Sequence, residues 1–163
     1  MLSLCGGMTS CGDDDDEPKP DDLVTDTIKV KYDVETSSDL RKYCDVTASY
    51  TDGKGEIVIA EITKDDTQFE FTVDRSQARR TYTVTLVASP KKDFPAYTDS
   101  QNYTVSWDVE VDMERYNSKG NKIGEVEDNN RQTLTVAGSS LMQCLSKISM
   151  TPISAHVTYN GDN

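Results

Sequence analysis

The residues that could carry chemistry are four cysteines, one histidine and many carboxylates. A single histidine, His156, and the lack of any C-x-x-C pair exclude the common zinc sites. The chain also has no G-x-S-x-G turn, no P-loop and no G-x-G-x-x-G motif. No carboxylate stands alone in an apolar stretch that would raise its pKa, so hydrolysis by paired carboxylates is the least favoured function. We therefore expect a protein that is not an enzyme, without a cofactor or a metal site.

Two cysteines fall within the body of the chain at positions that point inward. Cys44 lies on the apolar face of an expected strand, and Cys144 lies on the apolar stripe of an expected helix. In an oxidising compartment, a disulfide between them would close a loop of about 100 residues. By lowering the entropy of the unfolded chain, it would stabilise the fold by about 4–5 kcal/mol. Two separate buried thiols that behave as small hydrophobic groups are the alternative. The spacing alone does not decide between them.

Three aromatic residues mark a second candidate site. Phe94, Tyr97 and Tyr103 lie in or beside the irregular, proline-bearing stretch 89–101. Aromatic side chains on a loop of a sandwich can form a stacking platform for a glycan. The alternative is that they cover the edge of the hydrophobic core. His156, by contrast, alternates outward on the last expected strand, and an exposed strand histidine is usually inert.

A short motif surrounds Cys11. Thr9 and Ser10 precede this cysteine, and the acidic run 13–17 follows it. The motif resembles the lipobox and export signal of Bacteroidetes surface lipoproteins, with Met8 where leucine is usual. The resemblance covers residues 1–20 and implies acylation of Cys11. Acyl chains each contribute about 0.8 kcal/mol per buried CH₂, so two or more hold a protein on a membrane.

The stretch before the motif is a poor signal peptide. Residues 1–10 contain no Lys or Arg and no continuous apolar segment, although a signal needs both. We expect that most of the signal lies upstream of this start. Residues 1–22 are then a signal remnant, a lipobox and a disordered, acidic and proline-bearing linker. A disordered cytosolic tail that happens to carry two cysteines is the alternative.

Composition bounds the rest of the chain. The formal net charge is −12, which argues against nucleic acid and against electrostatic binding to an anionic membrane. No stretch approaches the roughly 20 apolar residues of a spanning helix. Hydrophobic residues make up only 35% of the 163 residues, so residues 23–161 suit one domain with a thin core.

Alternating apolar and polar residues predict a series of strands. We expect strands over 27–35, 44–50, 57–62, 69–73, 82–88, 103–113, 123–127, 134–136 and 153–159. Tight hairpins are expected at 52–55 and 117–121, and a polar turn at 36–39. The 57–62 strand is apolar on both faces, which is typical of the middle of a sheet. Leu141, Cys144, Leu145 and Ile148 form the one apolar helical stripe, with Ser139 or Ser140 as its cap.

Many short strands with one short helix before the last strand predict an all-β fold, a single antiparallel immunoglobulin-like sandwich. A lipocalin-like barrel is the alternative. The function that follows is a non-catalytic lipoprotein, anchored at the outer membrane or cell surface, that binds glycans, adheres or serves as a structural part. The alternatives are a barrel that carries a small apolar ligand and, last, an enzyme. The expected partners are a membrane, reached through the lipid, and a glycan or other surface proteins.

Overall fold

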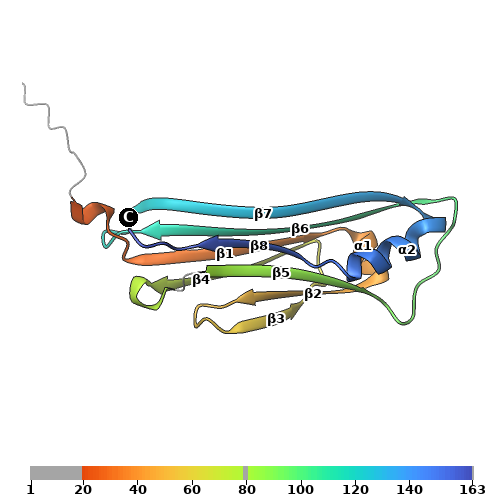
Figure 1. Ribbon diagram of the computed structural model, residues 1–163, viewed down its shortest axis with the longest axis horizontal. Coiled ribbons are helices and arrows are strands. Elements are labelled where there is room, and N and C mark those ends of the chain that lie inside the picture. Colours follow the sequence, from red (N-terminus) through yellow and green to blue (C-terminus); the bar gives the residue numbers. More distant parts are fainter. Residues whose placement is uncertain (1–19, 79–80, 163) are drawn as a thin grey trace, which may run out of the picture.

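The computed structural model describes residues 20–78 and 81–162. Within them, two four-stranded antiparallel sheets face each other (Figure 1). Sheet A has the order β4-β1-β6-β7 and sheet B has the order β3-β2-β5-β8. The strands of sheet A are β4 (Asp66–Asp74), β1 (Thr27–Thr36), β6 (Asn102–Tyr116) and β7 (Lys122–Ala137). Those of sheet B are β3 (Ile57–Glu61), β2 (Cys44–Thr51), β5 (Thr81–Pro90) and β8 (Ile153–Thr158).

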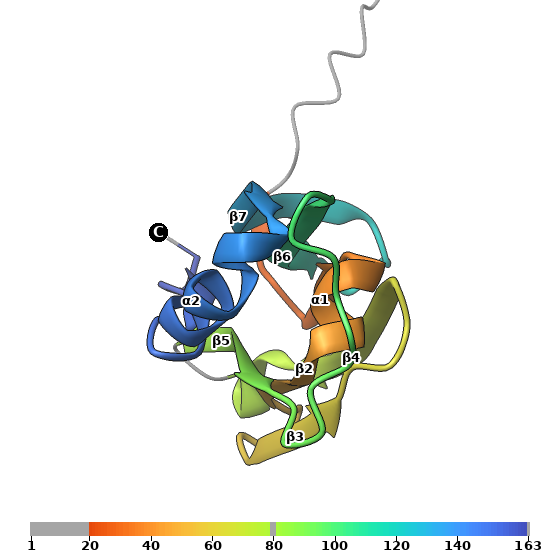
Figure 2. The same cartoon turned by 90° about the vertical axis from the view of Figure 1, so that its right-hand side faces the viewer.

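Two short α-helices lie at one end of the sandwich (Figure 1). The helices are α1 (Ser38–Tyr43) and α2 (Gly138–Ser149). Figure 2, which views the molecule from the helical end, shows both in front of the strands. Two 3-10 turns, η1 (Pro20–Leu23) and η2 (Arg75–Gln77), lie at the opposite end. No helix in the described part of the chain is long and apolar enough to cross a membrane.

The core lies between the sheets and follows from the alternation of the sequence. On β1 and β6 every second side chain is buried, as expected for strands with one face on a core. Trp107 on β6 is 4% exposed and belongs to this core. Leu40 from α1 and Leu141 from α2 are fully buried and close the helical end of the core.

The two sheets approach each other along β7 and β8 without joining into one ladder. The side-chain amide of Asn130 donates to the carbonyl of Ser154 at 3.3 Å, and the backbone N–H of His156 donates to the carboxylate of Asp128 at 2.8 Å. Side chains of β7 thus take the place of a neighbouring strand for β8. The antiparallel sandwich is confirmed, and the lipocalin-like barrel is wrong.

Four local predictions were also wrong. The stretch expected as a polar turn continues into α1, because Ser37 caps that helix through a bond from the Leu40 N–H. The two strands expected at 123–127 and 134–136 are one strand, β7, held by continuous pairing with β6. Helix α2 begins at Gly138 and has no side-chain cap at its first turn. The 57–62 strand lies at the edge of sheet B as β3, not in its middle.

Candidate functional site

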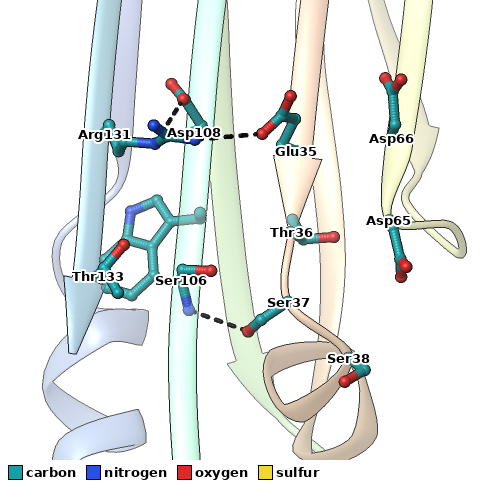
Figure 3. Close-up of a pocket in the computed structure, with 11 residues that line it drawn as sticks. Glu35, Thr36, Ser37, Ser38, Asp65, Asp66, Ser106, Asp108, Arg131 and Thr133 are labelled. Atoms are coloured by element: carbon teal, nitrogen blue, oxygen red, sulfur yellow. Dashed lines mark hydrogen bonds and ion pairs between the residues drawn. The ribbon is translucent and has the colours of Figure 1, made fainter. Parts of the chain in front are cut away.

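A polar pocket of about 360 Å³ opens on the outer face of sheet A, next to the start of α1 (Figure 3). It draws on the end of β1, the start of α1, the start of β4, and the middle of β6 and β7. Its lining residues are Glu35, Thr36, Ser37, Ser38, Asp65, Asp66, Ser106, Trp107, Asp108, Arg131 and Thr133. Hydroxyls, carboxylates and one guanidinium dominate this set.

Ser37 fixes the wall between β6 and α1. Strand β1 ends at Thr36, so the next residues of β6 have no strand beside them on that side. The Ser37 hydroxyl accepts hydrogen bonds from the Ser106 N–H at 2.9 Å and the Leu40 N–H at 3.2 Å. The carboxylate of Asp39 accepts the Thr104 N–H at 2.8 Å in the same way. Side chains from α1 and its cap therefore complete the edge that β1 leaves open.

Arg41 fixes the wall between β1 and β4. Its guanidinium donates to the hydroxyl of Thr36 at 2.7 Å and to the carbonyl of the same residue, and it also forms an ion pair with Asp65. The Thr36 N–H donates to the carbonyl of Asp65 at 2.8 Å. Asp65 and Asp66 are thereby held at the rim of the pocket.

Arg131 spans the floor of the pocket from β7 across β6 to β1. Its Nε lies 3.0 Å from Oδ2 of Asp108, and its Nη2 lies 3.4 Å from Oε2 of Glu35 (Figure 3). The Arg131 side chain is 66% exposed, so these ion pairs position groups more than they stabilise the fold. The other oxygen of Asp108, Oδ1, is buried and accepts no hydrogen bond from the described protein groups.

Three hydroxyls complete the pocket. Across the described ranges, no protein group bonds to the side-chain hydroxyls of Ser38, Ser106 and Thr133. Ser106 and Thr133 lie below the Asp108 and Arg131 pair in Figure 3, and Ser38 lies farther away on α1. The pocket therefore offers hydroxyl groups that can donate or accept, an orphaned carboxylate oxygen and a fixed cation. Such a set can hold a polyhydroxylated ligand by hydrogen bonds.

The predicted aromatic site lies at the helical end of the core. Phe94 stacks on Tyr43 with ring centroids 5.0 Å apart, and Tyr97 meets Phe94 edge-on at 5.8 Å. Tyr103 is 3% exposed, and its hydroxyl accepts the Thr98 N–H at 2.8 Å. The structure brings the three residues together, but only Tyr97 is exposed, at 38%. This packing favours the interpretation that they close the core.

Both body cysteines are free thiols in the structure. Cys44 is buried, as expected from its strand, and Cys144 is half-buried on α2. Burial raises the pKa of the Cys44 thiol to about 11, with the nearby Asp45 and Cys144 adding to the rise. Burial also raises the pKa of Cys144. Both are thus protonated at neutral pH, and their pairing stays a prediction. Cys11, the predicted lipidation site, lies outside the described residues.

His156 lies on the outer face of sheet B, as predicted. Its side chain is 65% exposed, and its Nδ1 lies 3.8 Å from Oδ2 of Asp128. Its neighbour Ser154 shares a hydroxyl–hydroxyl hydrogen bond of 3.0 Å with Thr85. The histidine therefore has no part in the polar pocket on sheet A.

A cluster of carboxylates on sheet A was not foreseen. Asp33 of β1 and Glu110 and Asp112 of β6 place one oxygen each within 4.8 Å of one another. Burial raises the pKa of Glu110 and of Asp112, and the surrounding carboxylates add to both rises. Lys31 forms an ion pair with Asp33 at 2.6 Å and offsets part of this charge. None of these carboxylates stands alone in an apolar stretch; they are brought together only because β1 and β6 pair in register.

The pocket, too, was missed by the sequence reasoning. The signal in the sequence was the outward alternation of Ser106 and Asp108 on β6, but their meeting with Arg131 depends on the β6–β7 register. Comparison with family models, with curated proteins and with solved structures gives no match to this chain. The argument for function therefore depends on the geometry of the chain itself.

Proposed function

We propose that this chain is the folded domain of an exported, lipid-anchored, non-catalytic protein that binds a glycan segment in the polar pocket on sheet A. The anchor is an acyl group on Cys11, and residues 12–19 form the spacer between the membrane and the domain. The glycan makes hydrogen bonds with the hydroxyls, the carboxylates and the guanidinium of the pocket.

The observation that carries the proposal is the orphaned Oδ1 of Asp108. Buried polar atoms in folded proteins almost always have a hydrogen-bond partner, so an unpaired acceptor on a residue that lines the pocket calls for a donor from elsewhere. A sugar hydroxyl can donate to this oxygen while it accepts from a neighbouring serine or threonine. The 360 Å³ of the pocket is at the lower end of the range of ligand sites, which suits one or two sugar rings.

The arrangement favours binding over catalysis. The Ser37 hydroxyl accepts two backbone N–H groups and holds the helix cap, which is a structural use. The chain's one histidine lies on the other sheet, so no histidine is placed to activate a pocket hydroxyl.

The position of the pocket fits an anchored domain. Asn117 and Lys119 of the β6–β7 hairpin hold Asp22, the first by a bond to its carbonyl at 2.9 Å and the second by an ion pair at 2.5 Å. The turn η1, which follows the predicted spacer in the chain, lies at the end of the fold opposite to α1 (Figure 1). Strand β1 has 10 residues and separates that end from the pocket by about 30 Å at 3.3 Å a residue. A ligand could reach the pocket while the domain stands on the membrane.

The test is glycan binding, first on an array and then by calorimetry with a glycan that the array identifies. Asp66→Asn and Thr133→Val remove pocket groups, and we expect each to weaken binding about 3- to 10-fold, the scale of one lost hydrogen bond. Asp74→Asn and Thr135→Val are matched controls. They make the same changes on the same two strands at positions that do not line the pocket, and they should bind as the parent protein does.

Two results would contradict the proposal. If no glycan binds, the ligand class is wrong. If glycan binding survives both pocket variants, the ligand class holds but the site is elsewhere. The anchor has its own test, which is metabolic labelling with a palmitate analogue of a gene that includes its upstream start. We expect label on the parent protein and none on Cys11→Ala; a parent protein without label contradicts the anchor.

A further inference from the structure

The free edge of β3 can be located from two hydrogen bonds. The Asp52 N–H donates to the Glu56 carbonyl at 2.9 Å, and the Ile62 N–H donates to the Val46 carbonyl at 2.9 Å. Bonded positions alternate along an antiparallel pair, so positions 56, 58, 60 and 62 face β2. The N–H and C=O groups at positions 57, 59 and 61 therefore point away from β2, to the outside of sheet B.

The side chains at these positions are exposed and two of them are apolar. Ile57 is 69% exposed and Ile59 is 73% exposed, and Glu61 is also exposed. They lie on the outer face of the sheet, whereas Val58 and Ala60 between them are half-buried. An open row of backbone groups beside exposed isoleucines is a template for another strand.

Two of the other three sheet edges, those of β4 and β8, are protected. On β4 the Thr36 N–H bond to the Asp65 carbonyl sets the alternation, so the free groups belong to positions 66, 68, 70, 72 and 74. Three of these positions carry exposed carboxylates, those of Asp66, Glu70 and Asp74. On β8 the open groups of Ser154 and His156 are bonded by side chains of β7. Charged side chains and covered backbone groups are the usual protections of a sheet edge. The edge of β3 has exposed isoleucines and uncovered backbone groups instead.

We propose that a second copy of this chain binds at β3, so that the two β3 strands pair antiparallel about a two-fold axis at Ile59. In this register Ile59 meets Ile59 of the other copy, and Ile57 meets Glu61. All three open positions of each strand are used at once, and sheet B becomes one continuous sheet of twice its four strands. The contact is isologous, which is the commonest way for two identical chains to associate.

Charge favours a second copy at this edge over the others. The chain carries a net charge of −12, so two copies repel unless they meet where carboxylates are few. On the outer face of sheet B, the residues beside β3 are hydroxyl-bearing, namely Thr47, Ser49 and Thr51 of β2 and Thr83 and Thr85 of β5. The proposed register also places the two Glu61 side chains about 14 Å apart along the strands, at 3.4 Å a residue.

The expected dimer is weak. A five-residue strand forms a contact well below the size of a standard interface, so we expect an equilibrium between monomer and dimer that shifts with concentration. The test is sedimentation velocity of the full 163-residue chain in reductant, from low micromolar to near millimolar concentration. Reductant excludes dimers formed by intermolecular disulfides.

Three variants locate the contact. Ile59→Lys places a charge on the two-fold axis, and Ile59→Pro removes an N–H that faces the open edge and none that bonds to β2. Both should remain monomeric at concentrations where the parent chain dimerises. Thr83→Lys adds the same charge on the same face two strands away and should dimerise within about threefold of the parent, because the distant charge is screened.

Each result of these experiments either supports or overturns the proposed β3 dimer. A parent chain that stays monomeric throughout overturns the proposal, as does a dimer that persists in Ile59→Lys. Circular dichroism and thermal unfolding show whether each variant is folded; if Ile59→Pro does not fold, Ile59→Lys and Thr83→Lys decide alone. Loss of dimer in Ile59→Lys with retention in Thr83→Lys supports β3 as the contact.

Discussion

At the scale of one residue, Asp112 shows how neighbouring carboxylates on the outer face of sheet A disfavour an ionised side chain. It lies between Lys31 of β1 and Glu127 of β7 in the register of the sheet. Burial and the Glu127 charge raise its pKa, and Lys31 only partly opposes them. Because its pKa in the folded chain lies above that in the unfolded chain, ionisation of Asp112 opposes folding.

We therefore expect Asp112→Asn to stabilise the protein at pH 7. The sign follows from linkage: below the unfolded pKa of about 4 the carboxyl is protonated in both states and the variant changes little. As pH rises through the folded pKa, the parent loses stability that the variant keeps. We expect a gain of about 0.5 kcal/mol, the scale of relieving one unfavourable cross-strand pair. Urea unfolding at pH 3 and pH 7 measures it.

Asp45→Asn is the control, because Asp45 is an exposed carboxylate on the outer face of the other sheet. It should change the free energy of unfolding less than Asp112→Asn does. A loss of stability for Asp112→Asn at pH 7 would mean that this carboxylate makes a net favourable contact with Lys31.

At the scale of elements, α1 is held to the sandwich by the cap that also builds the pocket. The Ser37 hydroxyl accepts hydrogen bonds from both the Leu40 and the Ser106 N–H groups. Ser37→Ala leaves both donors without this partner, and we expect a loss of about 1–2 kcal/mol in the free energy of unfolding. Chemical denaturation with an unchanged m-value would show that stability alone has changed.

Ser38→Ala is the matched comparison one residue later. No described protein group bonds to the Ser38 hydroxyl, so its removal should stay within about 0.5 kcal/mol of the parent. Equal losses for the two variants would contradict the role given to the Ser37 cap. The pair also separates fold from function, since Ser38 lines the pocket without supporting the helix.

The elements that could be predicted from the sequence are those whose signal is local. Strands β1 and β6 alternate in the sequence and do so in the structure, and the hairpin glycines Gly55 and Gly120 adopt the positive φ of 79° that such turns need. The start of α2, in contrast, is set by contacts with residues far away in the sequence. Its first N–H, that of Gly138, bonds to the Gln101 carbonyl at 2.8 Å, and a Cβ there would lie 2.0 Å from the Thr98 carbonyl oxygen. A loop 40 residues earlier in the chain thus decides where this helix begins.

The edge position of β3 and the pocket escaped prediction for a related reason. Apolar residues on both faces of β3 suggested a central strand, because periodicity reports burial or contact without saying which partner provides it. The pocket needs Glu35, Asp108 and Arg131 side by side, and only the registers of β1 with β6 and of β6 with β7 bring them together. Registers between distant strands leave little trace in a single sequence.

At the scale of the whole molecule, the two outer faces differ in character. Sheet A carries the ion pairs, the carboxylate cluster and the pocket, and sheet B carries mostly hydroxyls and the open β3 edge. A dimer through β3 would leave both pockets uncovered, since they lie on the other sheet. The proposed binding and the proposed association can therefore occur together, and each can fail without the other.

The end of the sandwich opposite to the two helices is closed by Asp162. Its carboxylate accepts the Thr25 N–H at 3.1 Å and the Thr25 hydroxyl, and it lies 3.2 Å from Nη2 of Arg75 and 3.7 Å from Nη1 of Arg115. One side chain thus joins the C-terminal segment to the start of β1, to η2 and to the end of β6. Partial burial raises the pKa of Asp162, but the Thr25 bonds and the two arginines outweigh it and lower the pKa overall.

Asp162→Asn should therefore have a pH signature opposite to that of Asp112→Asn. A lowered folded pKa contributes stability above the unfolded pKa of about 4, and this stability is lost as pH falls through the folded value. We expect the variant to lose about 1–2 kcal/mol at pH 7 and to converge with the parent in strong acid. Asp93→Asn, in the exposed loop between β5 and β6, controls for the loss of one charge. Equal losses at pH 7 and in strong acid would show that the effect of the substitution does not come from the charge of Asp162.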